Sequence, residues 1–284
     1  AIKDGHVKGA AIDVFAKEPP VDWTIIECDN VIVTPHLAAS TEEAQVKIAQ
    51  ELSDVVVDYF TKGVIRNAVN VPTLDWDTYK KLEPYISLAE KIGSYQGQII
   101  EGGIKSVDLE YAGDITKFNT TPLLVAYLKG LLTPMLDIKV NFVNAPVLAR
   151  ERNIKVKESK VQEAEDYTSL ITATIHTDTG KHTLAGTLFG HKNPRIVRLD
   201  DLTVDIVPAG SLLMVTNIDR PGVVGQVGTF LGKGSINIAG MQVARKEIGG
   251  EAMTIISIDS SVPADLIKQI SNFSGINKVK YVAL

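Results

Sequence analysis

The stretch SLLMVTNIDRPGVVGQVGTFLGKGSINIAG, residues 211–240, decides the fold of the last part of the chain. Its first eight residues are mostly apolar and predict a strand. Pro221 and Gly234 then frame a helix, because proline favours the first helical position and glycine favours the end. The apolar residues between them recur with a helical period along one stripe, namely Val223, Val224, Val227, Phe230 and Leu231.

Further elements follow this stretch to the end of the chain. Residues 236–247 and 251–259 predict two strands around a turn that contains two glycines. Residues 263–272 predict a helix and residues 276–284 a last strand. The order β-α-β-β-α-β is that of the ferredoxin-like fold.

A middle block precedes it and shows an α+β pattern. Residues 79–95 and 121–132 have helical spacing, and residues 104–111 alternate like a strand. Several strand-like segments follow residue 154. Pro208, Ala209 and Gly210 interrupt the pattern before the C-terminal unit begins.

The first part of the chain indicates an α/β arrangement. Residues 7–15 and 30–34 are continuous apolar runs, which are typical of parallel strands buried on both faces. Ser40 is a predicted helix N-cap with acidic residues after it, and the apolar stripe of that helix ends near Gly63. Residues 64–77 are irregular and predict a linker.

Composition excludes several classes of protein. The 284 residues carry a formal net charge of -5, which argues against nucleic acid or an anionic membrane as a partner. No apolar run is long enough for a membrane span, and the first residues do not form a signal peptide. Cys28 is the one cysteine, which fits a reducing compartment and leads us to expect a cytoplasmic protein. We expect no metal site.

His36 in VTPHLAAS (residues 33–40) is the candidate for chemistry. Asp13, Glu18 and His36 all follow predicted parallel strands, and α/β sheets bind ligands at that edge. A glutamate beside an imidazole raises its pKa, so that the pair can transfer a proton near neutral pH. The alternative is a buried histidine bonded to a backbone carbonyl, and sequence spacing does not decide between the two.

Two motifs carry a resemblance to a known family. AAIDVFAKEPP (residues 10–20) and DNVIVTPHLAASTEEAQ (residues 29–45) resemble the end of the nucleotide-binding domain of the D-2-hydroxyacid dehydrogenases. RNAVNVP (residues 66–72) is similar to the stretch that closes their catalytic region. The C-terminal unit behind an α+β block resembles, more narrowly, the long-form D-3-phosphoglycerate dehydrogenases. The resemblance covers essentially the whole chain.

This resemblance implies a domain organisation. Residues 1–62 would be the end of a Rossmann-type nucleotide-binding domain with its return helix, and residues 63–77 the linker that closes the catalytic region. Residues 78–208 would be a domain like the allosteric-substrate-binding domain, and residues 209–284 an ACT regulatory domain. The chain would be the C-terminal part of such an enzyme, since it begins at Ala1 without a methionine.

It also implies an activity, which is the NAD-dependent oxidation of D-3-phosphoglycerate to 3-phosphohydroxypyruvate, the first committed step of L-serine biosynthesis. His36 would be the acid/base and Glu18 its partner. Asp13 would contact the nicotinamide end of NAD, and the backbone from His36 through Leu37 and Ala38 to Ala39 would line the same pocket. Ala38 departs from the glycine usual in the family, which alters the expected cofactor contact.

Two parts of a complete site are absent from the sequence. No G-x-G-x-x-G motif with a following acidic residue occurs. The glycines of residues 222–228 (GVVGQVG) have a different spacing. The arginine that holds the substrate carboxylate in the family is also absent. We therefore expect the chain alone neither to bind NAD well nor to turn over.

Asn217, Asp219 and Asn237 are the predicted effector residues. The amides of a helix N-terminus attract a carboxylate, Asp219 could take an ammonium group, and Asn237 could bridge both. The resemblance implies L-serine as the effector, bound across a dimer of ACT units, and a homodimer or homotetramer formed through the ACT and middle domains. Alternatively, residues 219–222 are a tight helix entry and Asn237 is a turn residue.

Two other functions stay open. The chain could be a catalytically silent module for amino-acid sensing and oligomerisation, or it could belong to a dehydrogenase of another 2-hydroxy acid. The middle block offers candidate anion-binding cations in VLARER and GHKNPR, although such mixed charge more often marks a solvated surface. These candidates are Arg150, Arg152, His191, Lys192 and Arg195.

Overall fold

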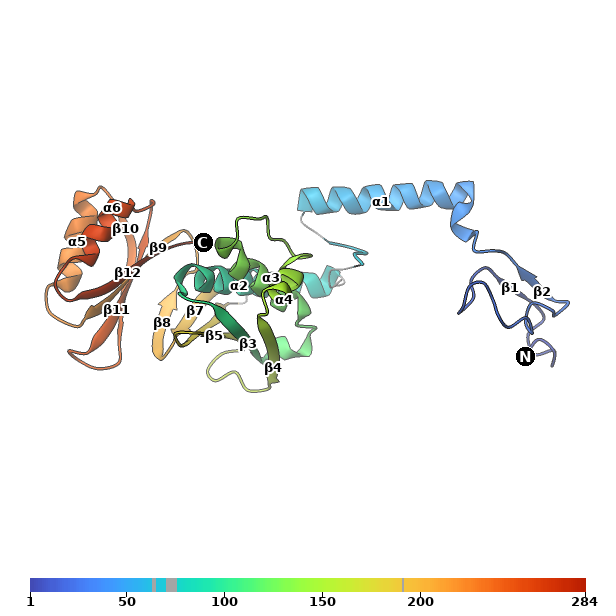
Figure 1. Ribbon diagram of the computed structural model, residues 1–284, viewed down its shortest axis with the longest axis horizontal. Helices are drawn as coiled ribbons and strands as arrows, with labels where there is room; N and C mark the ends of the chain where they lie inside the picture. The colour runs from blue at the N-terminus through green and yellow to red at the C-terminus, as the bar shows by residue number, and fades with distance from the viewer. Residues whose placement is uncertain (63–64, 70–75, 191) are drawn as a thin grey trace. The chain divides into compact units, whose positions relative to one another are not determined.

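The computed structural model describes residues 1–62, 65–69, 76–190 and 192–284. It divides the chain into two compact units, Ala1–Ala68 and Val69–Leu284 (Figure 1). Most of the predicted linker 63–77 lies outside the described residues. No helix in the described ranges is long and apolar enough to cross a membrane.

The described residues of unit 1 form two short strands and one long helix. Strand β1 (Ala10–Ile12) pairs in parallel with β2 (Val31–Val33), and a 3-10 turn, η1 (Ala38–Ser40), leads into α1 (Glu42–Lys62). The prediction of strands buried on both faces is wrong for this unit, since the side chain of Ile32 is 71% exposed. The apolar stripe of α1 is also exposed, because within unit 1 no second layer of described residues covers it.

The first part of unit 2 is a six-stranded sheet with helices. The sheet order is β4-β3-β5-β6-β7-β8, and only the β3–β4 pair is parallel. Its strands are β3 (Ile104–Gly113), β4 (Lys155–Val161), β5 (Ser169–Thr177), β6 (Lys181–Phe189), β7 (Asn193–Leu199) and β8 (Leu202–Ile206). Its helices are α2 (Trp76–Ile99), α3 (Thr121–Leu132) and α4 (Ala145–Glu151), with short 3-10 turns η2 (Asp114–Lys117) and η3 (Thr133–Met135).

Helices α2 and α3 lie unusually close to one another. A Cβ atom placed on Gly93 of α2 would lie 2.1 Å from the carbonyl oxygen of Tyr127 in α3, and one on Gly130 would lie 2.0 Å from that of Glu90. The absence of side chains at these glycines therefore lets the two backbones touch. Fully buried leucines and tyrosines on both helices complete the core beside this crossing.

The second part of unit 2 has the predicted ferredoxin-like order. It contains β9 (Ser211–Ile218), α5 (Val223–Lys233), β10 (Ile238–Arg245), β11 (Glu251–Ile258), α6 (Ala264–Ser271) and β12 (Ile276–Ala283). The strands form an antiparallel sheet in the order β10-β11-β9-β12. The prediction of a βαββαβ unit is confirmed. Of the predicted apolar stripe on α5, Val227 and Leu231 are fully buried, whereas Val224 is 40% exposed, so the prediction was wrong for that residue.

The two parts of unit 2 share one core. Leu212, Met214, Ile255 and Val282 of the C-terminal sheet belong to the same buried cluster as α2 and α3. Polar contacts join them as well: the carboxamide of Gln98 accepts a hydrogen bond from the backbone N–H of Ala283 (2.9 Å) and donates one to its carbonyl (2.8 Å). The C-terminal sheet is therefore covered on one face by its own helices and on the other by α2.

Candidate functional site

Asp13 stabilises the bend of residues 34–38, the corner in which His36 lies. Its carboxylate accepts hydrogen bonds from the Thr34 hydroxyl (2.5 Å) and from the backbone N–H groups of Leu37 (2.7 Å) and Ala38 (2.9 Å). The His36 N–H donates to the carbonyl of Asp13 (3.0 Å). These bonds hold His36 at φ 56°, in the left-handed region that residues other than glycine rarely adopt.

The strained backbone points the imidazole at Glu18. Nδ1 of His36 lies 2.9 Å from Oε2 of Glu18, and the other carboxylate oxygen accepts the N–H of Phe15 (3.0 Å). The bond to Phe15 and then the bond to His36 lower the pKa of Glu18, so its carboxylate stays ionised. The hydrogen bond from the ring to this carboxylate and its negative charge raise the pKa of His36.

These contacts decide between the two interpretations of His36. The side chain is 61% exposed, and its ring bonds a carboxylate. The alternative of a buried histidine satisfied by a backbone carbonyl is therefore wrong. Because Nδ1 donates to Glu18, Nε2 is left to accept a proton from a ligand.

A pocket of about 550 Å³ opens beside the pair. Its lining combines polar side chains with the apolar side chains of Phe15, Trp23 and Ile26, the usual composition of a small-molecule site. The pocket is lined by Asp13, Phe15, Glu18, Pro19, Pro20, Trp23, Ile26, Val33, Thr34, Pro35 and His36.

Hydrogen bonds within the chain limit which backbone groups near His36 could bind a dinucleotide. The amides of Leu37 and Ala38 are bonded to Asp13, and the carbonyl of Ala39 accepts the side chain of Gln45 (2.6 Å). The apolar lining residues and His36 fit the ring end of a nicotinamide cofactor. Residues 1–62 contain only two glycines, at positions 5 and 9, so no glycine-rich loop for its phosphates occurs there.

The three predicted effector residues have partners within the C-terminal unit. Asn217 is buried, donates to the carbonyl of Ile218 (2.9 Å) and accepts the Thr254 hydroxyl (3.1 Å). Asn237 donates to the carboxylate of Asp259 (2.6 Å).

Asp219 organises the turn between β10 and β11. It accepts the N–H of Gly249 (3.1 Å), and its own N–H donates to Gly250. It also forms an ion pair with Arg245, a residue that the sequence pattern did not single out. The bond from Gly249 and then the bond from Arg245 lower the pKa of Asp219, so it carries the negative charge that an ammonium ligand needs.

Asn237 does not lie beside Asp219 in one chain, so the predicted bridge of one ligand by both residues requires two copies. The backbone of Asn237 pairs with Asp259, next to the start of β9, whereas Asp219 follows the end of β9. Strand β9 has eight residues, so the two positions are about 25 Å apart along the sheet. Both could reach one ligand only if a second copy supplied Asn237.

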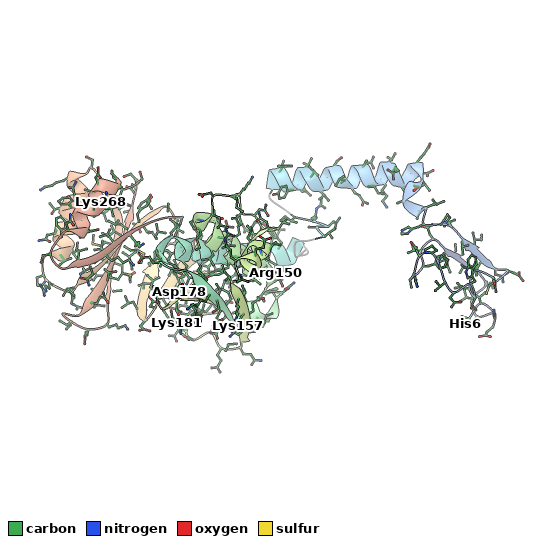
Figure 2. All side chains as sticks on the ribbon, viewed as in Figure 1. His6, Arg150, Lys157, Asp178, Lys181 and Lys268 are labelled. Carbon is green, nitrogen blue, oxygen red and sulfur yellow. The ribbon has the colours of Figure 1, made fainter. Side chains whose placement is uncertain are left out.

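Among the described candidate anion-binding cations of the middle block, Arg150, Arg152 and Lys192 are exposed and Arg195 is already paired. Arg150 is exposed on α4 (Figure 2). Arg195 is used in an ion pair with Asp205 (3.1 Å) and stacks over the Phe189 ring. His191 lies outside the described residues.

Three family sequence models match separate parts of the chain. Residues 1–38 match the NAD binding domain of D-isomer specific 2-hydroxyacid dehydrogenases. Residues 81–200 match the D-3-phosphoglycerate dehydrogenase intervening domain, and residues 211–275 match the ACT domain.

Curated relatives match over the whole chain. D-3-phosphoglycerate dehydrogenases of Methanocaldococcus jannaschii and Bacillus subtilis are each 39% identical over 100% of this chain and 54% of their own length. A chloroplastic D-3-phosphoglycerate dehydrogenase of Arabidopsis thaliana is 31% identical over 48% of its length. The chain thus spans about half the length of the relatives it matches. Through these three segments and their order, the chain is similar along its whole length to part of the D-3-phosphoglycerate dehydrogenases.

Proposed function

We propose that this chain supplies the proton-transferring histidine and the regulatory domain of an NAD-dependent D-3-phosphoglycerate dehydrogenase, which forms 3-phosphohydroxypyruvate for L-serine biosynthesis. The pairing of His36 with Glu18 at the edge of a pocket is the observation that carries this proposal. The family matches support it, and the cytoplasm is the location that goes with it.

His36, Glu18 and Asp13 each have a separate role in the oxidation of an alcohol. Nε2 of His36 takes the proton of the substrate 2-hydroxyl, and the carboxylate of Glu18 stabilises the imidazolium that results. Asp13 keeps the corner in place, so that the ring faces the pocket. A bound NAD would supply the hydride acceptor that the oxidation of the substrate alcohol to a carbonyl requires.

The test of the dehydrogenase role uses a protein of the relatives' full length that contains residues 1–284. We expect NADH formation from D-3-phosphoglycerate and a fall in kcat of about 10²- to 10⁴-fold in His36→Asn, the usual contribution of a general base. His6→Asn is the matched control, because His6 is exposed and lies outside the pocket lining. Turnover of a different 2-hydroxy acid instead of D-3-phosphoglycerate would favour the alternative dehydrogenase.

A second function concerns the C-terminal unit, which we propose senses L-serine as a dimer. The match of residues 211–275 to the ACT domain supports amino-acid binding. Strand β10 lies at the edge of its sheet. Antiparallel pairing of two such edges would bring Asn237 of one copy to the Asp219 end of the other.

Calorimetry with L-serine on the 284-residue chain tests this second function. We expect binding that is lost in Asp219→Ala and in Asn237→Ala, and sedimentation as a dimer or tetramer. Heat with glycine but none with L-serine would reassign the effector. A monomer that binds L-serine at full affinity would refute the shared site.

A further inference from the structure

Among the residues that the structure describes, Arg245 is the cation that forms an ion pair with Asp219. It ends β10, and its register partner across the sheet is Ala252 of β11, which in turn faces Asn217 of β9. The side chain of Ala252 is small and buried, so the guanidinium reaches over β11 to the carboxylate of Asp219.

Arg245 also lies on the helix-bearing face of the sheet. Side chains alternate between faces along a strand, and Ala244 belongs to the core shared with α2, on the opposite face. Arg245 is therefore on the side of α5, whose first residue, Val223, comes four residues after Asp219. Gly222 ends the loop between them at φ 96°, a conformation that suits glycine.

The contacts of the pair leave groups free for a ligand. Asp219 uses one oxygen, Oδ2, for both Arg245 and the Gly249 N–H, and no described residue donates a hydrogen bond to Oδ1. Arg245 uses Nη1 for Asp219, and its side chain is 47% exposed. A guanidinium has five N–H groups, so Arg245 retains donors for a second carboxylate.

We propose that Arg245 binds the α-carboxylate of the free amino acid whose α-ammonium is taken by Asp219. The two side chains present an acceptor and a fork of donors next to each other, which complements a zwitterion. This rests on the proposed sensing function, and it assigns the carboxylate to a side chain rather than to the amides at the start of α5. An arginine binds a carboxylate with two parallel hydrogen bonds, which a lysine does not.

A purely structural role explains the ion pair between Arg245 and Asp219 less well than ligand binding does. The turn between β10 and β11 is already fixed to this loop by two bonds, from Gly249 to Asp219 and from Asp219 to Gly250. Exposed ion pairs add little to stability. Arg245 is therefore free to serve a ligand at small cost to the fold.

Calorimetry on the 284-residue chain tests the assignment with L-serine as the probe. We expect Arg245→Gln to weaken L-serine binding about 10- to 100-fold, the range for a lost charged hydrogen bond. Arg245→Lys should recover only part of this loss. Ethanolamine, which is L-serine without its carboxylate, should bind wild type and Arg245→Gln with the same low affinity.

Arg220→Gln is the matched control, since it removes an equal charge beside Asp219 from an exposed side chain. Circular dichroism of each variant confirms an intact fold. Equal affinity of wild type and Arg245→Gln for L-serine overturns the assignment and leaves the sensing function intact. A loss in Arg220→Gln alone also overturns it. Failure of the wild type to bind any free amino acid overturns the sensing function itself.

Discussion

Replacing Gly93 by alanine should destabilise unit 2, although alanine is the better helix former. Gly93 is buried in the middle of α2, where the exchange alone would stabilise a helix by about 1 kcal/mol. The new Cβ would, however, lie 2.1 Å from the carbonyl oxygen of Tyr127 and 2.8 Å from the N–H nitrogen of Leu131. Both are backbone atoms, which no rotamer change can move aside.

The magnitude follows from the displacement that this overlap requires. Contacts of Cβ atoms below 3.0 Å essentially do not occur, so α2 and α3 must separate by about 0.9 Å at the crossing. A gap of that size removes a quarter to a half of the dispersion energy of the atoms beside it. We take the upper end of the overpacking range, about 3 kcal/mol, because the whole backbone must shift. The better helix propensity of alanine offsets about 1 kcal/mol of this, so the net loss in the free energy of unfolding is about 2 kcal/mol.

Thermal unfolding followed by circular dichroism checks this value. A net loss of about 2 kcal/mol should lower Tm by about 4–8 °C in a unit of this size. Gly228→Ala is the matched control: Gly228 is also in the middle of a helix, and its new Cβ would meet one side-chain atom at 4.0 Å. That variant should raise Tm by about 1–4 °C. A Tm for Gly93→Ala at or above wild type would refute the reasoning.

Three further outcomes are expected. Glu18→Gln should lower the pKa of His36 toward its ordinary value, because the charged acceptor is lost; a proton NMR titration with an unchanged midpoint would contradict this. Asp13→Ala should speed hydrogen exchange of the Leu37 and Ala38 amides, which donate hydrogen bonds to this carboxylate; unchanged exchange would mean that the bend at His36 is stable without it. Hydrogen bonds from Lys280 and Lys278 of β12 lower the pKa of Glu101 to about 2. The ionised carboxylate should therefore stabilise unit 2 above pH 4.5, and this stabilisation should be lost as the pH falls toward 2. Urea unfolding of Glu101→Gln should therefore differ from wild type at pH 7 and converge with it near pH 2.

The C-terminal unit could be predicted because its signals are local. The predicted strand 211–218 coincides with β9, and the predicted helix between Pro221 and Gly234 contains α5. Apolar periodicity reports which face is buried, and proline and glycine mark the ends of a helix. Both kinds of signal depend only on residues within a few positions of each other.

The contacts of the corner at His36 could not be predicted in the same way. Sequence position placed Asp13, Glu18 and His36 after parallel strands, but the identity of the histidine's partner came from a family resemblance. The main partners of Asp13 are two backbone amides and a threonine hydroxyl. Every residue except proline has such an amide, so no residue type reveals which ones a carboxylate will accept.

The contact between the sheet of the C-terminal unit and α2 was hidden for a related reason. Met214 of β9 and Tyr95 of α2 each have the pattern of a core residue of their own domain, yet the Tyr95 hydroxyl lies 2.7 Å from the sulfur of Met214. Asn217, three residues further along β9, faces the other side of the sheet, toward α5 and the effector residues. One strand thus connects the amino-acid site to the middle block. A ligand at Asp219 would affect α2 through the sheet itself, because β9, β11 and β12 all contribute residues to the core that they share with α2 and the helices of the C-terminal unit do not lie on the face that α2 covers.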